Sequence, residues 1–242
     1  MKIYAHRGSS LLWPENTLVA FEQADKHGAA AFETDLRLSK DGEIVLAHDD
    51  NLARFGQPDK TISELTAGEV CATTIPSPDG KLSGNIITLK MLLEKFPNKD
   101  YIFDCKITSE LLMRTLENTL RKLVFRKRIW FLTWSQEADE LVEKYFPEHP
   151  IFPREARTRT WGLLSIVGLG VASEPKNKIL ALPAYFRGLP VFSKNQVSSI
   201  QQRGKEFVGY LVNSRKDYDR CVRCGVQVVL TDRPDLISSF MA

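Results

Sequence analysis

The residues of this 242-residue chain that could do chemistry stand in short groups, each following an apolar segment. They are two histidines, three carboxylates, an arginine and a lysine: His6, Arg7, Glu33, Asp35, His48, Asp104 and Lys106. Histidine transfers protons near neutral pH, carboxylates bind hard cations, and arginine and lysine hold phosphate oxygens. Any one pair fits a structural ion network equally well, so the argument for a reactive site depends on the whole set.

Two pairs share a spacing that puts both side chains on one side of a strand. Glu33 and Asp35 are two residues apart, so in a β-strand they lie on the same face. Two carboxylates there repel each other unless a cation lies between them, and the sequence offers them no obvious basic partner. Oxygen ligands of this kind suit Mg²⁺ or Ca²⁺, and the pattern does not choose between the two. Asp104 and Lys106 repeat the spacing, which places an acid beside a base.

Strand-like segments alternate with longer amphipathic segments along the chain. We expect strands at Lys2–Ala5, Ala30–Leu36, Ile44–Ala47, Tyr101–Cys105, Arg128–Leu132, Ile179–Pro183, Glu206–Val212 and Gln227–Leu230. We expect helices at Thr17–His27, Glu110–Leu123, Gln136–Tyr145 and Asn195–Arg203. Asn16 is the expected N-cap of the first helix, and Gly28 its expected end. Alternation of this kind predicts a parallel α/β architecture.

Two parallel architectures are open at this point. A doubly wound nucleotide-binding sheet usually carries a glycine-rich turn after its first strand, whereas the segment Ala5–Gly8 holds a single glycine. Eight strand candidates in a chain of this length favour a (β/α)8 barrel, forming one domain over residues 1–242. The carboxyl ends of barrel strands meet at one mouth, and that is where the reactive side chains stand.

Composition excludes several classes of protein. With 43% hydrophobic and 26% charged residues, the chain resembles an ordinary globular domain and neither a disordered nor a fibrous one. A net charge of +3 is too small to indicate nucleic acid as a partner. We find no apolar run long enough for stable membrane insertion and no room for a signal peptide near Met1, and four cysteines suggest no disulfide framework. We therefore expect a soluble, cytoplasmic protein of open oligomeric state.

An ordered set of motifs spans the chain. Residues 5–54 contain His6-Arg7-Gly8, Pro14-Glu15-Asn16-Thr17, Glu33-x-Asp35, Lys40-Asp41-Gly42 and His48-Asp49, and Phe103-Asp104-x-Lys106 and Thr231-Asp232-x-Pro234 follow. The set closely resembles the signature of the glycerophosphodiester phosphodiesterase family. The match is dense over residues 5–54 and sparse over the middle of the chain.

The resemblance implies a (β/α)8 barrel that hydrolyses phosphodiesters with a divalent cation, Mg²⁺ or Ca²⁺. The product would be an alcohol and sn-glycerol 3-phosphate, from a small-molecule glycerophosphodiester. The roles it implies are acid–base catalysis for His6 and His48, metal binding for Glu33, Asp35 and Asp104, phosphate contact for Arg7 and Lys106, and a supporting contact or occasional ligation for Glu15. Which histidine is the acid, and whether a cyclic phosphate forms, stay open.

Three positions depart from the family pattern. The third metal position is usually Glu and here is Asp104, which either binds the cation directly, reaches it through water, or only pairs with Lys106. Arg54 is followed by Phe55-Gly56, and a late strand reads Tyr210-Leu211-Val212-Asn213, where the family often has Trp-Thr-Val-Asn. Substrate preference is therefore the most open property. The alternatives are phospholipase D-like cleavage of lysophospholipid or sphingolipid headgroups, and a barrel that binds phosphodiesters without cleaving them.

For several other notable residues the sequence predicts a structural role and no part in the site. We expect His27 to close a helix, His149 to lie in a loop, and Cys221 and Cys224 to be structural, because no second cysteine pair accompanies them. The stretch 161–173 reads as a buried barrel helix or as an apolar loop at the mouth.

Overall fold

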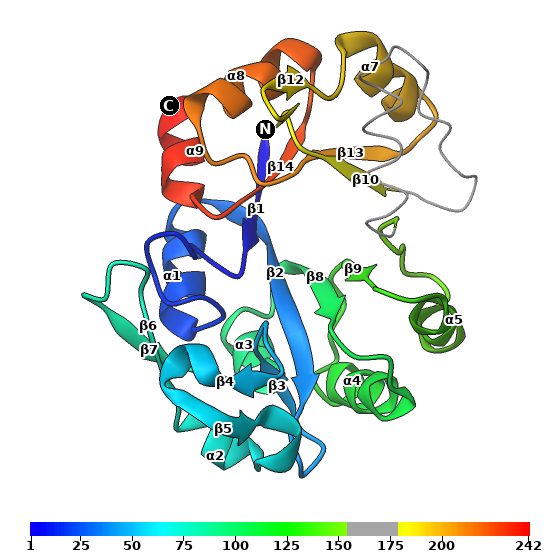
Figure 1. The fold of residues 1–242 in the computed structure, drawn as a ribbon. Helices are drawn as coiled ribbons and strands as arrows, with labels where there is room; N and C mark the ends of the chain where they lie inside the picture. Colours follow the sequence, from blue (N-terminus) through cyan, green and yellow to red (C-terminus); the bar gives the residue numbers. More distant parts are fainter. Residues whose placement is uncertain (154–178) are drawn as a thin grey trace.

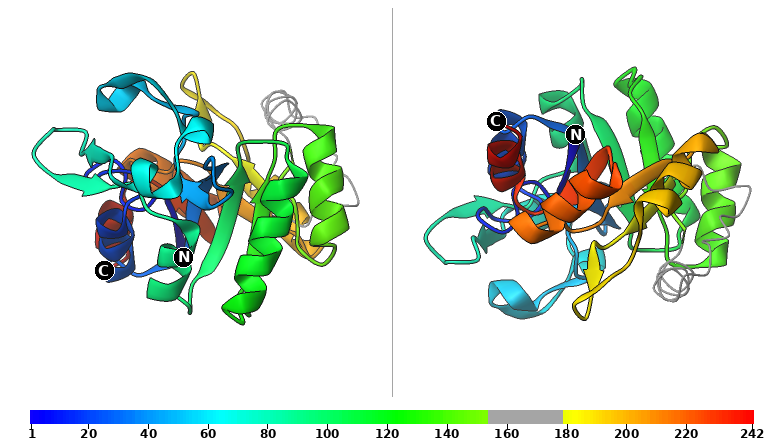
Figure 2. Two further views of the ribbon diagram at one scale, coloured as in Figure 1. Left: turned by 90° about the horizontal axis from the view of Figure 1, so that it is seen from below. Right: turned by 90° about the horizontal axis from the view of Figure 1, so that it is seen from above.

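The computed structural model describes residues 1–153 and 179–242 (Figure 1). Within these ranges seven parallel strands form one sheet in the order β10-β13-β14-β1-β2-β8-β9. Their bounds are β1 Lys2–His6, β2 Ala29–Leu38, β8 Asp100–Cys105, β9 Ile129–Leu132, β10 Ile179–Leu182, β13 Glu206–Gly209 and β14 Val228–Thr231. The sheet curves into a barrel wall with helices outside it, so the predicted α/β barrel is confirmed (Figure 2).

Hydroxyl side chains begin most of the covering helices. The helices are α1 Leu18–Lys26, α3 Leu89–Lys95, α4 Glu110–Lys122, α5 Gln136–Tyr145, α7 Lys194–Gln202, α8 Arg215–Cys224 and α9 Pro234–Met241. Thr17, not Asn16, caps α1 by accepting a bond from the Ala20 N–H, so the predicted cap was wrong by one residue. The reason is that the Asn16 amide is used elsewhere: it donates to Asp35. His27 and Gly28 end α1 as expected, with Gly28 in the left-handed region that suits glycine.

A long insertion separates β2 from α3. It holds β3 Ile44–Leu46, α2 Ala67–Cys71, the 3-10 turns η1 Ala53–Phe55 and η2 Ile62–Glu64, and the hairpins β4 Asn51–Leu52 with β5 Gln57–Thr61 and β6 Thr74–Pro76 with β7 Ser83–Asn85. The expected strand Ile44–Ala47 exists but runs antiparallel to β2, because a short return without a crossover can pair only that way. It is therefore not a barrel strand.

One more expected strand is shorter than predicted, and one hairpin was not predicted. The expected strand Glu206–Val212 ends at Gly209, and the chain turns at Leu211, whose φ is +51°. A short hairpin that we did not predict follows β10. It pairs β11 Tyr185–Phe186 with β12 Leu189–Pro190. The stretch 161–173 lies outside the described residues. Among the described helices, none has the length and apolar character that crossing a bilayer requires.

The strands sort their side chains by alternation. One face of the sheet packs against the helices, where Ile3, Ala5 and Phe32 belong to the larger apolar cluster. The other face lines the barrel interior, where Tyr4, Ala31 and other buried residues form a second cluster: Ile102, Trp130, Ile179, Val208, Val228 and Leu230. Two residues further along three strands, the same inward face carries polar groups. The polar side chains of the site therefore lie next to this second apolar cluster, closer to the carboxyl ends of the strands.

Candidate active site

Strand register brings the acidic residues together. Asp35 of β2 lies opposite Asp104 of β8, and Glu33 of β2 lies opposite His6 of β1. Glu33, Asp35 and Asp104 are buried and each offers a carboxylate oxygen within 4.8 Å of the others. The predicted shared face of Glu33 and Asp35 is thus what the structure shows, and Asp104 joins them from the neighbouring strand.

Two cations lie against this cluster. Arg7 Nε is 3.0 Å from Asp35 Oδ2, and Lys106 Nζ is 3.1 Å from Asp35 Oδ1 and 2.6 Å from Asp104 Oδ2. The expectation that Glu33 and Asp35 lack a basic partner was wrong for Asp35. Its partners come from the ends of two neighbouring strands, a relation that local spacing cannot reveal. The acid–base contact expected between Asp104 and Lys106 is present.

The three carboxyl groups differ in their pKa values although they are neighbours. Burial raises the pKa of Glu33 to about 8, against the opposing effect of His6. Burial also raises the pKa of Asp104, although Lys106 opposes it. For Asp35, burial is outweighed by Arg7, by Lys106 and by the hydrogen bond from Asn16, so its pKa is lowered. Asp35 is therefore the carboxyl group of the set that ionises most readily, whereas burial favours the protonated form of Glu33.

His6 is held from the opposite side by Asp232. Its Nδ1 lies 2.6 Å from Asp232 Oδ1, while its Nε2 lies 3.8 Å from Glu33. Asp232 is itself fixed at the end of β14, since Asn213 donates to its Oδ2 and Ser10 to its Oδ1. Burial alone would lower the pKa of His6, but Glu33 and the bond to Asp232 outweigh burial and raise it. The imidazole is thus oriented and kept ready to carry a proton.

The turn after β1 aims Arg7 inward. Arg7 has φ +54°, and its backbone N–H donates to Glu33 Oε2 at 3.1 Å. Gly8 follows with φ +80°, where a Cβ would lie 2.6 Å from the Ala20 carbonyl carbon, so only glycine fits. A side-chain residue in the left-handed region is uncommon, and at a site of this kind it marks a conformation that the surroundings impose.

His48 stands in a different setting. It follows β3, its backbone oxygen accepts two bonds from Arg37 at 3.0 and 2.6 Å, and its Nδ1 lies 2.7 Å from Asp49 Oδ1.

A series of ion pairs leads from Asp49 to Arg7. Asp49 pairs with Arg54, Arg54 pairs with Glu15 at 2.6 Å, and Glu15 pairs with Arg7 at 3.3 Å. Glu15 therefore bridges two arginines, and it connects the His48 loop to the carboxylate cluster. His48 itself supplies no atom to that cluster.

Sequence reasoning missed two contacts in this site. Trp134 donates from its indole N–H to Asp104 Oδ1 at 2.7 Å, and Lys106 Nζ lies 4.8 Å from the centre of its ring. Asp232 was recognised as part of a motif but received no role. Both follow directly after a strand, β9 and β14, so the strand-end rule that selected the other residues could have found them.

The cluster fits a divalent cation. Three buried carboxylates carry more negative charge than Arg7 and Lys106 neutralise. Burial raises the pKa of two of the three, and the carboxylates add to this effect on one another, so a bound cation would favour their ionised forms. Asp35 Oδ1 is buried, with Lys106 Nζ 3.1 Å away. All the donors are oxygen atoms, the set that Mg²⁺ and Ca²⁺ prefer. Glu33, Asp35 and Asp104 would hold the ion.

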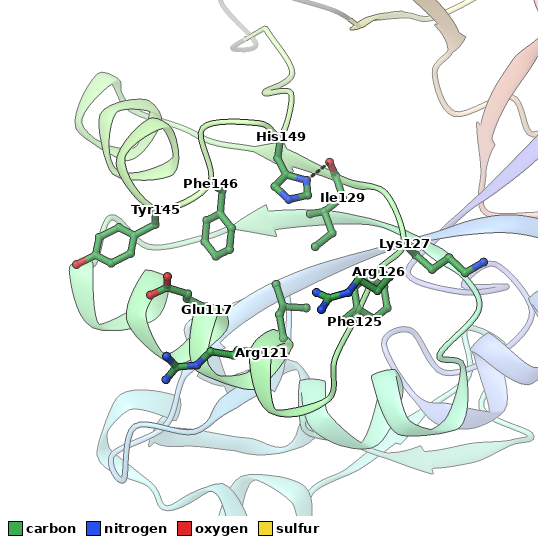
Figure 3. Close-up of a pocket in the computed structure, with 10 residues that line it drawn as sticks. Glu117, Arg121, Phe125, Arg126, Lys127, Ile129, Tyr145, Phe146 and His149 are labelled. Atoms are coloured by element: carbon green, nitrogen blue, oxygen red, sulfur yellow. Dashed lines mark hydrogen bonds between the residues drawn. The ribbon is translucent and has the colours of Figure 1, made fainter.

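A separate cavity of about 270 Å³ lies between α4, α5 and the segment that enters β9 (Figure 3). His149 borders it, and its Nδ1 lies 3.3 Å from the Ile129 carbonyl oxygen. None of the residues that line this cavity belongs to the cluster above. Cys221 and Cys224 are buried on α8 as free thiols, which agrees with a structural role.

Comparisons with known proteins agree with this geometry. The model of the glycerophosphoryl diester phosphodiesterase family matches residues 6–236. The chain is 27% identical to a glycerophosphodiester phosphodiesterase of Caldanaerobacter subterraneus subsp. tengcongensis, over 97% of this chain and 95% of that one. It is 24% identical to human lysophospholipase D GDPD1, over 99% of this chain and 86% of the relative.

Solved structures show the same fold. The glycerophosphoryl diester phosphodiesterase domain of a Mycobacterium tuberculosis protein superposes with a TM-score of 0.84 at 16% identity, covering 100% of this chain and 99% of the other. A phosphodiesterase of Oleispira antarctica, solved with the product sn-glycerol-3-phosphate, gives 0.73 at 21% identity, covering 100% and 96%. With a family match that runs from His6 almost to the end of the chain, the protein belongs to the glycerophosphoryl diester phosphodiesterase family and is a phosphoric diester hydrolase.

Proposed function

We propose that this chain hydrolyses glycerophosphodiesters to an alcohol and sn-glycerol 3-phosphate with the help of one divalent cation, Mg²⁺ or Ca²⁺. The observation that carries the proposal is the buried cluster of Glu33, Asp35 and Asp104 with Arg7 and Lys106 at its edge. A site of three acids and two cations matches the charge pattern of a phosphodiester bound to a metal. The proposal treats residues 1–242 as one domain, in the cytoplasm, acting on a small molecule and on no nucleic acid.

Two basic side chains would hold the phosphate. The planar guanidinium of Arg7 can contact two phosphate oxygens at once, while Lys106 adds a compact charge. Each now pairs with a carboxylate, so the phosphate would enter an arrangement already oriented by Asp35 and Asp104. A bound cation would neutralise carboxylate charge and polarise the same phosphate oxygens.

His6 and His48 would move the protons. One imidazole takes a proton from the attacking hydroxyl and the other gives a proton to the departing oxygen. His6 has a fixed partner in Asp232, which stabilises the protonated ring, and His48 has Asp49. Glu15 would act through Arg7 and Arg54, keeping both guanidinium groups in place without contacting the substrate.

A second candidate is phospholipase D-like cleavage of lysophospholipid or sphingolipid headgroups on the same barrel. The third acid is Asp104, shorter than the usual Glu, and it accepts a hydrogen bond from Trp134, which places a half-exposed aromatic ring beside it. The 24% identity to a human lysophospholipase D supports the same direction.

A panel assay separates the candidates. Purified protein with added Mg²⁺ or Ca²⁺ is incubated with glycerophosphocholine, glycerophosphoethanolamine, glycerophosphoglycerol and a lysophospholipid. Release of sn-glycerol 3-phosphate from the water-soluble diesters supports the first candidate, and turnover of the lysophospholipid alone supports the second. Binding of these diesters without turnover of any of them would contradict both.

A further inference from the structure

Each carboxyl group of the cluster accepts a hydrogen bond from a neutral N–H group. The pairs are Glu33 with the Arg7 backbone at 3.1 Å, Asp35 with the Asn16 amide at 2.8 Å, and Asp104 with the Trp134 indole at 2.7 Å. A neutral donor fixes the direction of a carboxylate oxygen without adding a charge that would repel a cation. The first two donors come from the segment between β1 and α1, whereas Trp134 follows β9. The cluster is thus held from both sides of the strand pair β2–β8.

The Trp134 backbone is held on both sides. Leu132, the last residue of β9, lies opposite Asp104 in the sheet, and Trp134 comes two residues further along the chain. The hydroxyl of Thr133 bonds to a side chain of α5, and the hydroxyl of Ser135 caps that helix by accepting one of its backbone N–H groups. Trp134 therefore approaches Asp104 from a segment whose neighbouring residues are fixed.

Burial does not account for Trp134. It is 50% exposed, whereas Trp130 of β9 is 3% exposed. Because hydrophobic stabilisation follows the apolar area removed from water, it is smaller for Trp134 than for Trp130. The indole N–H of Trp134 instead donates to Asp104, a carboxyl group that is 4% exposed. The polar contact is therefore the feature of this tryptophan that needs an explanation.

Lys106, the other donor to Asp104, has several partners. Its Nζ lies 2.6 Å from Asp104 Oδ2, 3.1 Å from Asp35 Oδ1 and 4.8 Å from the centre of the Trp134 ring. The indole has a single N–H, and it is given to Asp104 Oδ1. A cation held by Asp35 and Asp104 would compete with the Lys106 ammonium for their oxygens, because both are positive. The neutral bond from Trp134 is free of that competition.

We propose that Trp134 is a positioning residue of the metal centre, which keeps Asp104 in the orientation that a divalent cation needs. Trp134 acts through Asp104 and does not itself bind the cation. The proposal rests on the proposed function, in which Asp104 is one of the three ligands. Partners of this kind typically account for about 10–100-fold in metal affinity, so losing the indole N–H should weaken cation binding by about tenfold.

Calorimetric titration of the metal-free protein with Mg²⁺ or Ca²⁺ tests the proposal without turnover. Trp134→Phe removes the N–H and keeps an aromatic ring, and it should raise the dissociation constant about tenfold. Trp134→His keeps a ring N–H at the same number of bonds from Cα, so it should recover most of the affinity at a pH at which the introduced imidazole is neutral. Trp13→Phe, at a half-buried tryptophan of the segment between β1 and α1, is the matched control and should bind the cation like wild type.

Two further measurements separate positioning from a merely structural role. In an Asp104→Asn background, Trp134→Phe should have little further effect on the dissociation constant, because the two residues act through one contact. Turnover of a water-soluble diester by Trp134→Phe should fall at limiting cation and recover in excess cation, with little change in KM for the diester. A purely structural tryptophan would lower the thermal unfolding temperature in chelator and would give no such recovery.

The outcomes distinguish this proposal from the proposed function. Weaker binding in Asp104→Asn with an unchanged constant in Trp134→Phe would overturn the role of Trp134 and leave the metal centre in place. Unchanged constants in both variants, or equal losses in Trp134→Phe and Trp13→Phe, would also overturn it. No cation binding by the wild type would overturn it together with the metal dependence of the proposed function, whereas release of sn-glycerol 3-phosphate in the panel assay tests the hydrolysis independently.

Discussion

His6 and His48 stand in contrasting surroundings although the proposed chemistry needs both. The His6 side chain is 14% exposed, ends a central strand and is oriented by Asp232, whose own oxygens are bonded to Asn213 and Ser10. The His48 side chain is 38% exposed and lies after β3, and its Nδ1 pairs with Asp49, the first residue of a series of ion pairs that leads through Arg54 and Glu15 to Arg7. The difference teaches that one of the two histidines proposed to carry protons lies at the end of a barrel strand, while the other lies in the insertion between β2 and α3.

Removing divalent cations should have the largest effect. We expect chelation to abolish turnover and added Mg²⁺ or Ca²⁺ to restore it. Because His6 lies 3.8 Å from Glu33, a cation there should also lower the pKa of His6. Titration of the His6 imidazole by NMR with and without the cation measures this shift. Full activity in protein shown to be free of metal would contradict this expectation.

Replacing either histidine by alanine should lower kcat by at least ~10²-fold, the usual scale for a positioned acid or base. The double variant should be little worse than the poorer single one if the two act as a unit. Binding of a substrate analogue should weaken much less, since Arg7 and Lys106 remain. His149→Ala is the matched control, because His149 borders the separate cavity and should leave kcat unchanged. Near-normal kcat in His6→Ala or His48→Ala would remove that histidine from the mechanism.

Replacing the carboxylate partner of each histidine should show the same difference between His6 and His48. Asp232→Asn should lower kcat by about tenfold, part of the ~10²–10⁴-fold effect of acid–base catalysis, and Asp49→Asn should cost less because its histidine is more exposed. Losing the anion beside His6 should also lower the pKa of His6, since the hydrogen bond that His6 donates to Asp232 helps to raise it. The limb of the pH profile that belongs to His6 should therefore move to lower pH in Asp232→Asn. A larger loss in Asp49→Asn would reverse the comparison.

The ion pairs of the insertion should matter least. Arg54→Ala breaks the contacts to Asp49 and Glu15, but exposed pairs typically contribute only a few tenths of a kcal/mol to about 1 kcal/mol each, so kcat should fall only a few-fold. The effect should shrink further at high salt, where such pairs are screened. Lys90→Ala, which breaks an exposed pair with Glu94 on α3, is the control for a change in surface charge. A loss as large as that of His48→Ala would show that Arg54 does more than position its neighbours.

Local sequence patterns predicted the residues of the carboxylate cluster better than they predicted long-range partners or strand direction. Strand alternation was enough to put Glu33 and Asp35 on one face, and the strand-end rule selected Asp104 and Lys106. By contrast, the partner of His6 lies 226 residues away in sequence, at Asp232, and no spacing rule reaches that far. Ile44–Ala47 has the composition of a buried strand, but its direction depends on the short return from β2, which composition does not encode.

The Asn16 error has a similar origin. Asn is a good N-cap in isolation, yet here its amide serves the site, donating to Asp35 while its oxygen accepts from Thr34. Asn16 also has φ +57°, a conformation that Asn tolerates better than most residues. A residue needed by long-range contacts was thus unavailable for the local role, and the neighbouring Thr17 took it. Contacts within the site therefore decided the role of Asn16, against its local preference for a helix N-cap.

Titration calorimetry of the metal-free protein with Mg²⁺ or Ca²⁺ tests the central claim, that Glu33, Asp35 and Asp104 form the metal centre. Because the pKa of Glu33 is raised to about 8 and that of Asp104 is also raised, binding near pH 7 should release protons, seen as a heat that depends on the buffer. Proton release should fall as pH rises above about 8. Asp104→Asn should weaken binding by about tenfold or more if it ligates directly, whereas the exposed control Asp79→Asn should not. An unchanged dissociation constant in Asp104→Asn would remove Asp104 from the ligands, and no saturable binding by the wild type would contradict the account.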